Sequence, residues 1–142
     1  TLTVGSIAAG YKILKVFFQG TVATGTPVVN LELNDDATAA NYDSQQLSGV
    51  GATAGAAGQV DNRAVLGEIG TASTDGEITI YQFSTTAAKR YHATNGDGTG
   101  YFSIINGRWL NTANEITKIE LITATSNFVD GSIMWVYGLT GS

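Results

Sequence analysis

Residues 11–19 read YKILKVFFQ and are followed by Gly20. This run is rich in aromatic and β-branched residues, which favour a strand, and the glycine favours a turn after it. Residues 77–83, EITIYQF, show the same tendency more regularly, because isoleucines alternate with polar or aromatic residues. Alternation with a period of two residues is typical of a strand whose two faces meet different surroundings. These two stretches predict that the chain is built from β-strands.

Strand-like stretches continue along the whole chain, and no window shows a convincing helical period. Residues 36–45 would form at most one or two helical turns. Eight stretches, or nine with residues 2–7 counted as a short strand, predict one all-β domain of about eight strands over residues 1–142, an antiparallel β-sandwich or jelly roll. The Gly/Ala-rich segment at residues 48–59, SGVGATAGAAGQ, is interpreted as a long loop. The remaining predicted strands lie at residues 28–33, 64–69, 89–94, 101–105, 116–124 and 132–139.

Charge and composition exclude several classes of partner and chemistry. Seven Lys and Arg residues against twelve Asp and Glu give a net charge of −5, the wrong sign for holding nucleic acid or an anionic membrane surface. The chain has no cysteine and one histidine, His92, which excludes disulfides and multi-histidine metal sites. No stretch approaches the ~20 continuous apolar residues of a membrane-spanning helix. We therefore expect no nucleic acid, membrane or cofactor as a partner.

The surface is expected to carry unusually little charge. Charged residues make up 13% of the chain, about half of the usual ~25%. Gly, Ala and Thr together account for 54 of the 142 residues. A surface of small uncharged side chains favours close packing against neighbouring subunits, whereas a free monomer usually depends on surface charge for its solubility. The composition therefore indicates self-association.

Two Asn/Asp-rich segments are candidates for metal binding, and a turn is the favoured interpretation of both. Residues 34–36 (NDD) offer oxygen ligands that a hard cation would accept together with Glu32 or Asp43, but the spaced Asp pattern of a calcium loop is absent. Asn and Asp favour turns because their side chains bond to their own backbone. Capped turns are therefore expected at residues 34–36 and at residues 95–98 (NGDG).

No residue is marked as catalytic. His92 lies in a strand-like stretch between Arg90 and Thr94, so a structural role is favoured over catalysis. The Gly-x-Ser-x-Gly motif is absent, and nothing marks a pair of carboxylates for glycoside hydrolysis. The sequence predicts no catalytic, cofactor-binding or metal-binding residues, and hence a protein that is not an enzyme.

The last predicted strand is apolar on both faces. In residues 132–139, SIMWVYGL, one face carries Ile133, Trp135, Tyr137 and Leu139, and the other carries Met134 and Val136. A two-layer sandwich leaves one face of each sheet in water, so a doubly apolar strand indicates a neighbouring element or subunit. Trp109, which follows the turn-like Asn106-Gly107, is expected to be the aromatic residue most exposed to solvent. The residues predicted to form intermolecular contacts are Phe17, Phe18, Trp109, Met134 and Val136, with residues 1–9 as a possible arm.

Three motifs follow one another along most of the chain. The first is LELNDD at residues 31–36 with Asn41-Tyr42 after it, the second is ITKIEL at residues 116–121, and the third is FVDGS at residues 128–132, which continues to VYGL at residues 136–139. This series resembles a recurrent β-sandwich virion protein of tailed bacteriophages. Those proteins share an Asn/Asp-rich turn before Asn-Tyr, an I-x-x-I-x-L strand and a terminal F-x-x-G-S-x-x-x-x-Y-G-Leu/Ile strand, of which the last is the distinctive motif.

The resemblance implies a non-enzymatic structural protein of the virion. Its leading form is a capsid decoration protein, a homotrimer that binds the major capsid protein on the outer head surface and stabilises the shell. The alternative is a jelly-roll module of a tail or fibre, such as a carbohydrate-binding receptor adhesin. That alternative predicts exposed aromatic rings beside amide side chains, for instance Trp109 with Asn106 and Asn111.

Overall fold

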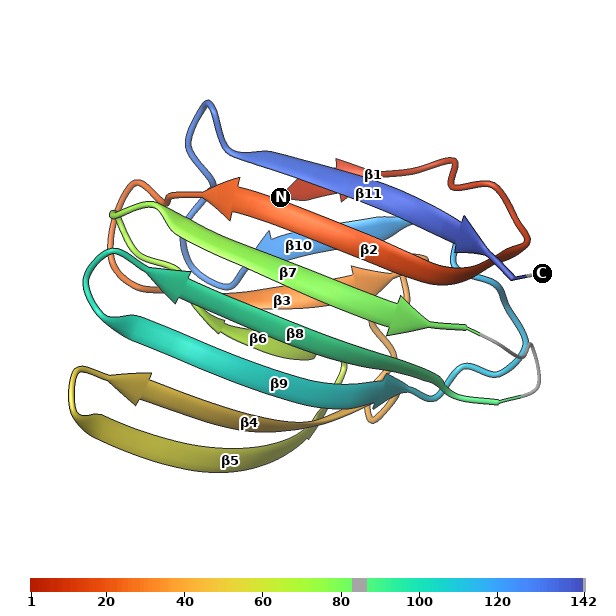
Figure 1. Ribbon diagram of the computed structural model, residues 1–142, viewed down its shortest axis with the longest axis horizontal. Coiled ribbons are helices and arrows are strands. Elements are labelled where there is room, and N and C mark those ends of the chain that lie inside the picture. Colours follow the sequence, from red (N-terminus) through yellow and green to blue (C-terminus); the bar gives the residue numbers. More distant parts are fainter. Residues whose placement is uncertain (83–86, 142) are drawn as a thin grey trace.

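The computed structural model describes residues 1–82 and 87–141. Within those ranges the chain forms strands and no helix, and none of the described segments is a helix long and apolar enough to cross a membrane. Figure 1 shows the strands in two layers, with the larger sheet in front of the smaller one. The strands are β1 (Leu2–Val4), β2 (Tyr11–Gly20), β3 (Val28–Leu33), β4 (Tyr42–Val50), β5 (Thr53–Asp61), β6 (Ala64–Glu68), β7 (Thr74–Tyr81), β8 (Lys89–Asp97), β9 (Tyr101–Trp109), β10 (Ile119–Thr123) and β11 (Ile133–Thr140).

The two layers are antiparallel sheets of unequal size. The seven-stranded sheet has the order β11-β2-β7-β8-β9-β4-β5, and the four-stranded sheet has the order β1-β10-β3-β6. Every neighbouring pair of strands is antiparallel. The predicted all-β antiparallel sandwich is therefore confirmed, with eleven strands among the described residues instead of about eight. The end of the predicted strand at residues 77–83, Phe83, lies outside the described residues.

The additional strands come from the Gly/Ala-rich segment, and its interpretation as a long loop is wrong. β4 and β5 pair along their full length as a hairpin, and β4 also pairs with β9. The segment lacks bulky residues, so it shows no hydrophobic alternation, yet the pairing of β5 with β4 and of β4 with β9 supplies the backbone hydrogen bonds that these strands need. The same pairing explains why no helical turns form at residues 36–45, since Tyr42 already begins β4. Gly51, with a φ of 58°, makes the tight connection.

The core lies between the two sheets and follows the expected alternation. β2 directs Leu14, Val16 and Phe18 inward, and all three are at most 3% exposed. These side chains meet the inward-facing aliphatic residues of β3 and β10 in one hydrophobic cluster. The aliphatic residues of that cluster from the smaller sheet's central strands are Val29, Leu31, Leu33, Ile119 and Leu121.

Trp109 belongs to this core, so the expectation that it is exposed is wrong. Its side chain is 0% exposed because β9 directs alternate residues inward and Trp109 is the last of them. The indole Nε1–H donates a hydrogen bond of 2.7 Å to an Asp36 carboxylate oxygen. The Lys89 ammonium lies 5.5 Å from the ring centroid and donates to the Asn111 carbonyl at 2.8 Å. Burial lowers the pKa of Lys89, and the negative charge of Glu115 partly opposes this shift.

Candidate interaction surface

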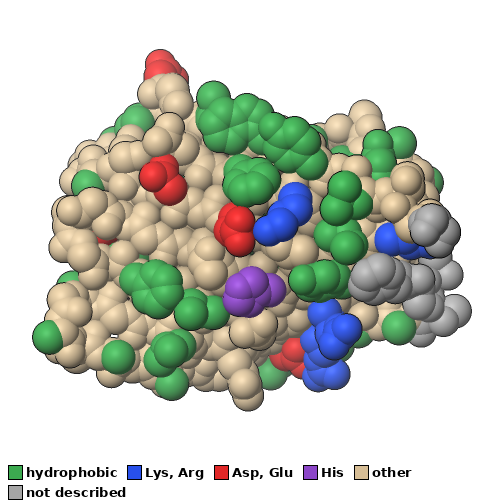
Figure 2. Space-filling view, viewed as in Figure 1, with side chains coloured by type: hydrophobic (Ala, Val, Ile, Leu, Met, Phe, Trp, Pro, Cys, Tyr) green, Lys and Arg blue, Asp and Glu red, His purple; other side chains and the backbone are tan. Residues whose placement is uncertain are grey.

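The outer face of the seven-stranded sheet carries an apolar surface along β2 and β11. We define this apolar surface as Phe17, Ile133, Trp135, Tyr137 and Leu139, whose exposed fractions run from 39% to 57%. Figure 2 shows hydrophobic side chains gathered over that edge of the face. The register explains the grouping, since Trp135 lies directly opposite Phe17 and the outward residues of β11 follow one another at every second position. Because contiguous exposed apolar groups are typical of interaction sites, the apolar surface is a candidate for contact with another molecule.

Side-chain contacts hold part of the apolar surface in a defined arrangement. The rings of Phe17 and Tyr137 meet edge to face, with centroids 6.0 Å apart and an interplanar angle of 74°. Lys15 lies beside them, with its ammonium 5.8 Å from the Phe17 ring centroid. The same ammonium pairs with Glu77 at 3.3 Å, so an ion pair borders the apolar surface on its β7 side.

The sequence predicts the apolar character of this strand pair, but the residues that it names on β11 lie on the face that packs on the core. Met134 and Val136 point toward the core and are packed against it, while the residues that alternate with them form the exposed apolar surface. Phe18 is 3% exposed, so the folded chain does not offer its side chain to a partner. Of the predicted contact residues, only Phe17 lies in the apolar surface. β11 is apolar on both faces, so its sequence alone does not show which face packs on the core.

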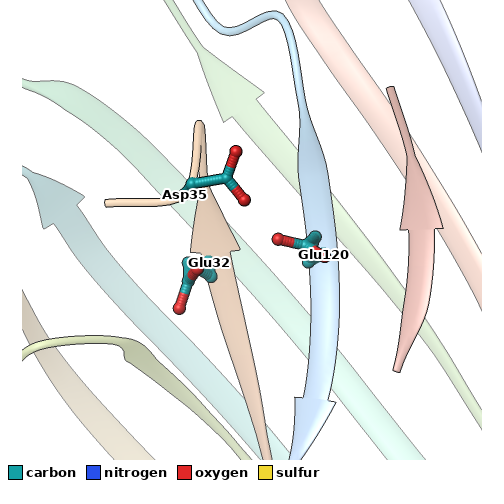
Figure 3. Close-up of side chains that lie close together, drawn as sticks. All are labelled: Glu32, Asp35 and Glu120. Carbon is teal, nitrogen blue, oxygen red and sulfur yellow. The ribbon is translucent and has the colours of Figure 1, made fainter. Parts of the chain in front are cut away.

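The candidate cation site is a network of ion pairs. Carboxylate oxygens of Glu32, Asp35 and Glu120 lie within 4.8 Å of one another, on β3, the turn after it and β10 (Figure 3). Lys118 already neutralises two of them, with its ammonium 2.5 Å from Asp35 and 3.0 Å from Glu120, and Arg63 pairs with Glu32. The hydrogen bond from Lys118 lowers the pKa of Asp35 despite some desolvation. The basic side chains supply the positive charge that a cation would otherwise bring.

The Asn/Asp-rich segment at residues 34–36 forms a turn, as favoured, but the turn expected at residues 95–98 is misplaced, because residues 95–97 end β8 and the turn follows at residues 98–99. Asn34 and Asp35 have φ values of 54° and 58°, a left-handed conformation that Asn and Asp tolerate. The Asn34 amide oxygen accepts hydrogen bonds from the backbone N–H groups of Thr117 at 2.8 Å and Lys118 at 3.0 Å. Asp97 likewise accepts bonds from nearby backbone N–H groups. Asp43, the other proposed ligand, is bound by Arg108 instead, and this hydrogen bond and the charge of Asp43 raise the pKa of Arg108.

A second feature of the outer face is a shallow hollow over the opposite half of the sheet. It has a volume of about 840 Å³ and is lined mainly by polar side chains of β4, β8 and β9. His92 lines it, with its Nδ1 3.0 Å from the Asn106 amide oxygen, so the single histidine contacts an amide rather than a serine nucleophile. Sequence reasoning missed this hollow, although the alternation of Arg90 and His92 in one strand was visible.

The predicted sugar platform of Trp109 with Asn106 and Asn111 does not exist on this surface. The Trp109 ring is buried. The side-chain oxygen of Asn111 accepts hydrogen bonds from the backbone N–H groups of Ala113 and Asn114. Comparisons of the chain with protein-family models, with curated proteins and with solved structures found no match. Function is therefore argued from these surfaces and from the sequence motifs.

Proposed function

We propose that this protein is a non-enzymatic structural subunit that binds a larger protein assembly through the apolar surface on β2 and β11. The observation that carries this proposal is the row of large apolar side chains on β11, of which Tyr137 and Leu139 are 57% and 55% exposed. Burying each of these side chains against a partner would stabilise the complex by about 25 cal/mol per Å² of apolar area removed from water. The arrangement suits a protein whose work is to bury surface against a neighbour.

The assembly we propose is the virion of a tailed phage, with the protein on the outer surface of the head as a capsid decoration protein. The support is the motif resemblance, and the structure shows what its most distinctive motif does. Phe128 packs on the backbone at Gly20, Gly131 adopts a φ of 88°, and the Ser132 hydroxyl accepts a bond from the Thr21 N–H at 3.3 Å. The F-x-x-G-S motif therefore forms the turn that precedes β11 and places it beside β2.

Many copies of a modest interface would account for shell stabilisation. An ordinary protein interface buries about 1,600 Å² in total, and its effect is multiplied when subunits engage a repeating lattice. In this proposal the partner is the major capsid protein, and the subunits self-associate as homotrimers. The low charge of the chain suits close subunit packing.

Sedimentation with empty phage heads tests the proposal. Purified protein is mixed with shells of the major coat protein from the same genome, and light scattering measures its oligomeric state alone. Saturable co-sedimentation of a trimer is expected. The variant Trp135→Ser should bind at least tenfold more weakly, because Trp135 lies within the apolar surface. The matched control is Phe102→Ser on β9, an aromatic residue 49% exposed on the same face but outside the apolar surface, and it should bind normally.

Two results would contradict this assignment. Absence of binding by the wild-type trimer would move the protein from the head to the alternative, a tail or fibre module, which the same experiment with purified tails examines. Equal loss of binding in the Phe102→Ser control would show that the apolar surface is not the contact.

A further inference from the structure

The hollow on the outer face is lined by residues of five neighbouring strands. One of them is Gly58 on β5, which lies opposite Gln45 on β4 and adds no side chain to the wall. The hollow spans β7 to β5, whereas the apolar surface lies on β2 and β11. The side chains that matter for its chemistry are Gln45, Tyr81, Arg90, His92, Asn106 and Arg108.

The hollow contains an unbalanced positive charge. Arg90 and Arg108 are directly opposite each other on β8 and β9, where like charges repel. Arg108 is neutralised by Asp43, whose two carboxylate oxygens each accept a bond of 3.1 Å from its Nε. Within residues 1–82 and 87–141 the ion pairs do not include Arg90, which is exposed. Although the chain carries a net charge of −5, the Arg90 guanidinium is exposed to solvent at this hollow without an ion-pair partner among the described residues.

Polar groups with unused hydrogen-bonding capacity surround that charge. The Asn106 amide oxygen contacts His92, and the hydrogen bonds found in the described part of the chain leave the Asn106 amide N–H groups unused. Gln45 is exposed on the neighbouring strand and lies directly opposite Asn106. Tyr81, directly opposite Arg90 on β7, adds an aromatic ring to the wall. A guanidinium, two amides and a ring therefore converge on one open hollow.

We propose that this hollow binds an acidic saccharide. Arg90 would hold the sugar carboxylate, because a guanidinium presents paired N–H donors that match a carboxylate. The amides of Asn106 and Gln45 would bond to the hydroxyl groups, and the apolar face of the sugar ring would pack on Tyr81. Nucleic acid, which also carries anionic groups, is disfavoured by the net charge of −5.

The inference is independent of the head assignment and gives the carbohydrate-binding alternative a different site from the one its sequence suggested. Because Trp109 is buried, the ring in this site is Tyr81, and the site gains a charge preference that a platform of aromatic and amide groups alone would lack. An open hollow of this kind is expected to bind a single saccharide weakly, with useful affinity arising from several copies of the protein on one particle.

Titration of the trimer followed by amide NMR or calorimetry tests the proposal. The probes are trigalacturonic acid, a hyaluronan tetrasaccharide and 3′-sialyllactose, each beside a neutral counterpart: the methyl ester for the first two and lactose for the third. At least one acidic probe should bind and shift the signals of His92 and Asn106, while its neutral counterpart binds at least tenfold more weakly. Arg90→Gln should weaken binding of the acidic probe by about tenfold to a hundredfold, the effect of removing a charge-assisted hydrogen bond.

Lys12→Gln provides the charge-matched control, because it also removes one positive charge but lies on β2 outside the hollow. It should leave saccharide binding unchanged. Failure of every acidic probe to bind, equal binding of acid and neutral counterpart, or unchanged binding by Arg90→Gln would overturn the proposal. Equally effective competition by inorganic phosphate would also overturn it, since the site would then accept any anion. Arg90→Gln should keep full binding to phage heads, and Trp135→Ser should keep saccharide binding, so failure of either function is recognised separately.

Discussion

The two tryptophans occupy opposite environments, and replacing each with phenylalanine should separate them clearly. Trp109 is 0% exposed and donates a hydrogen bond to Asp36, whereas Trp135 is 44% exposed on the apolar surface. The substitution Trp109→Phe removes a hydrogen bond to a charged acceptor, which is worth about 1.5–3 kcal/mol. The smaller ring also leaves a void that costs roughly 1 kcal/mol, at about 24 cal/mol per Å³. Together these losses lower the free energy of unfolding by about 3 kcal/mol.

Trp135→Phe should change stability much less. The residue keeps an aromatic ring on a partly exposed strand, and among the described residues no hydrogen bond to its indole N–H is lost. The expected loss is below about 1 kcal/mol. In a domain of this size each kcal/mol corresponds to about 2–4 °C, so Tm should fall by about 6–12 °C in Trp109→Phe and by a few degrees at most in Trp135→Phe.

Urea unfolding and fluorescence quenching provide the assay. Each variant retains one tryptophan, so acrylamide should quench Trp135 in the Trp109→Phe protein strongly and Trp109 in the Trp135→Phe protein weakly. The reasoning is refuted if Trp109→Phe unfolds within about 1 kcal/mol of wild type. It is equally refuted if the two tryptophans are quenched to the same extent in the folded variants.

Three further predictions concern acid stability, close packing and the sheet edge. Burial alone would raise the pKa of Asp36. Hydrogen bonds from Thr38, Trp109 and Asn41 together lower it by more, so the pKa of Asp36 lies below its ordinary value. Its stabilising effect is therefore present above pH ~4 and lost as the pH falls through the folded-state pKa, and urea unfolding from pH 6 to pH 2 should show a smaller loss in Asp36→Asn than in wild type. Gly107→Ala should cost at least about 1–3 kcal/mol in the same assay, because its Cβ would lie 2.4 Å from a backbone oxygen, while Gly58→Ala should unfold like wild type. Amide hydrogens of β5 should exchange faster than those of β8, since β5 is an edge strand with nearly every residue exposed, and equal protection by mass spectrometry would contradict that placement.

Much of the fold is predictable because its strands carry their own signal. In β2, aromatic and β-branched residues followed by Gly20 specify the strand, but both faces are apolar, so the sequence does not show that Leu14, Val16 and Phe18 are the residues that point inward. The β4–β5 hairpin could not be found this way, because small residues such as those at 52–57 give no alternation and the hairpin depends on the pairing of β5 with β4 and of β4 with β9. Local sequence does not report such long-range pairing.

The candidate sites were predictable only in part, for two physical reasons. The β11 sequence shows that both its faces are apolar, but the choice between Met134 and Trp135 as the exposed residue depends on which face packs against the core. The hollow combines Tyr81, Arg90 and Gln45 from strands far apart in the sequence. Such a grouping appears only when the order of strands in the sheet is known. Trp109 was misplaced because the turn-forming residues before it continue β9 instead of ending it.

Hydroxyl-radical footprinting of the protein, free and bound to empty phage heads, tests whether the apolar surface is the face that contacts the assembly. The method measures the exposure of individual side chains, and Trp135 and Tyr137 are 44% and 57% exposed in the single chain. Oxidation of both is expected to fall sharply on binding, while oxidation of Phe102, 49% exposed outside the apolar surface, stays unchanged. Unchanged oxidation of Trp135 and Tyr137 in head-bound protein would show that the apolar surface is not where the assembly is contacted.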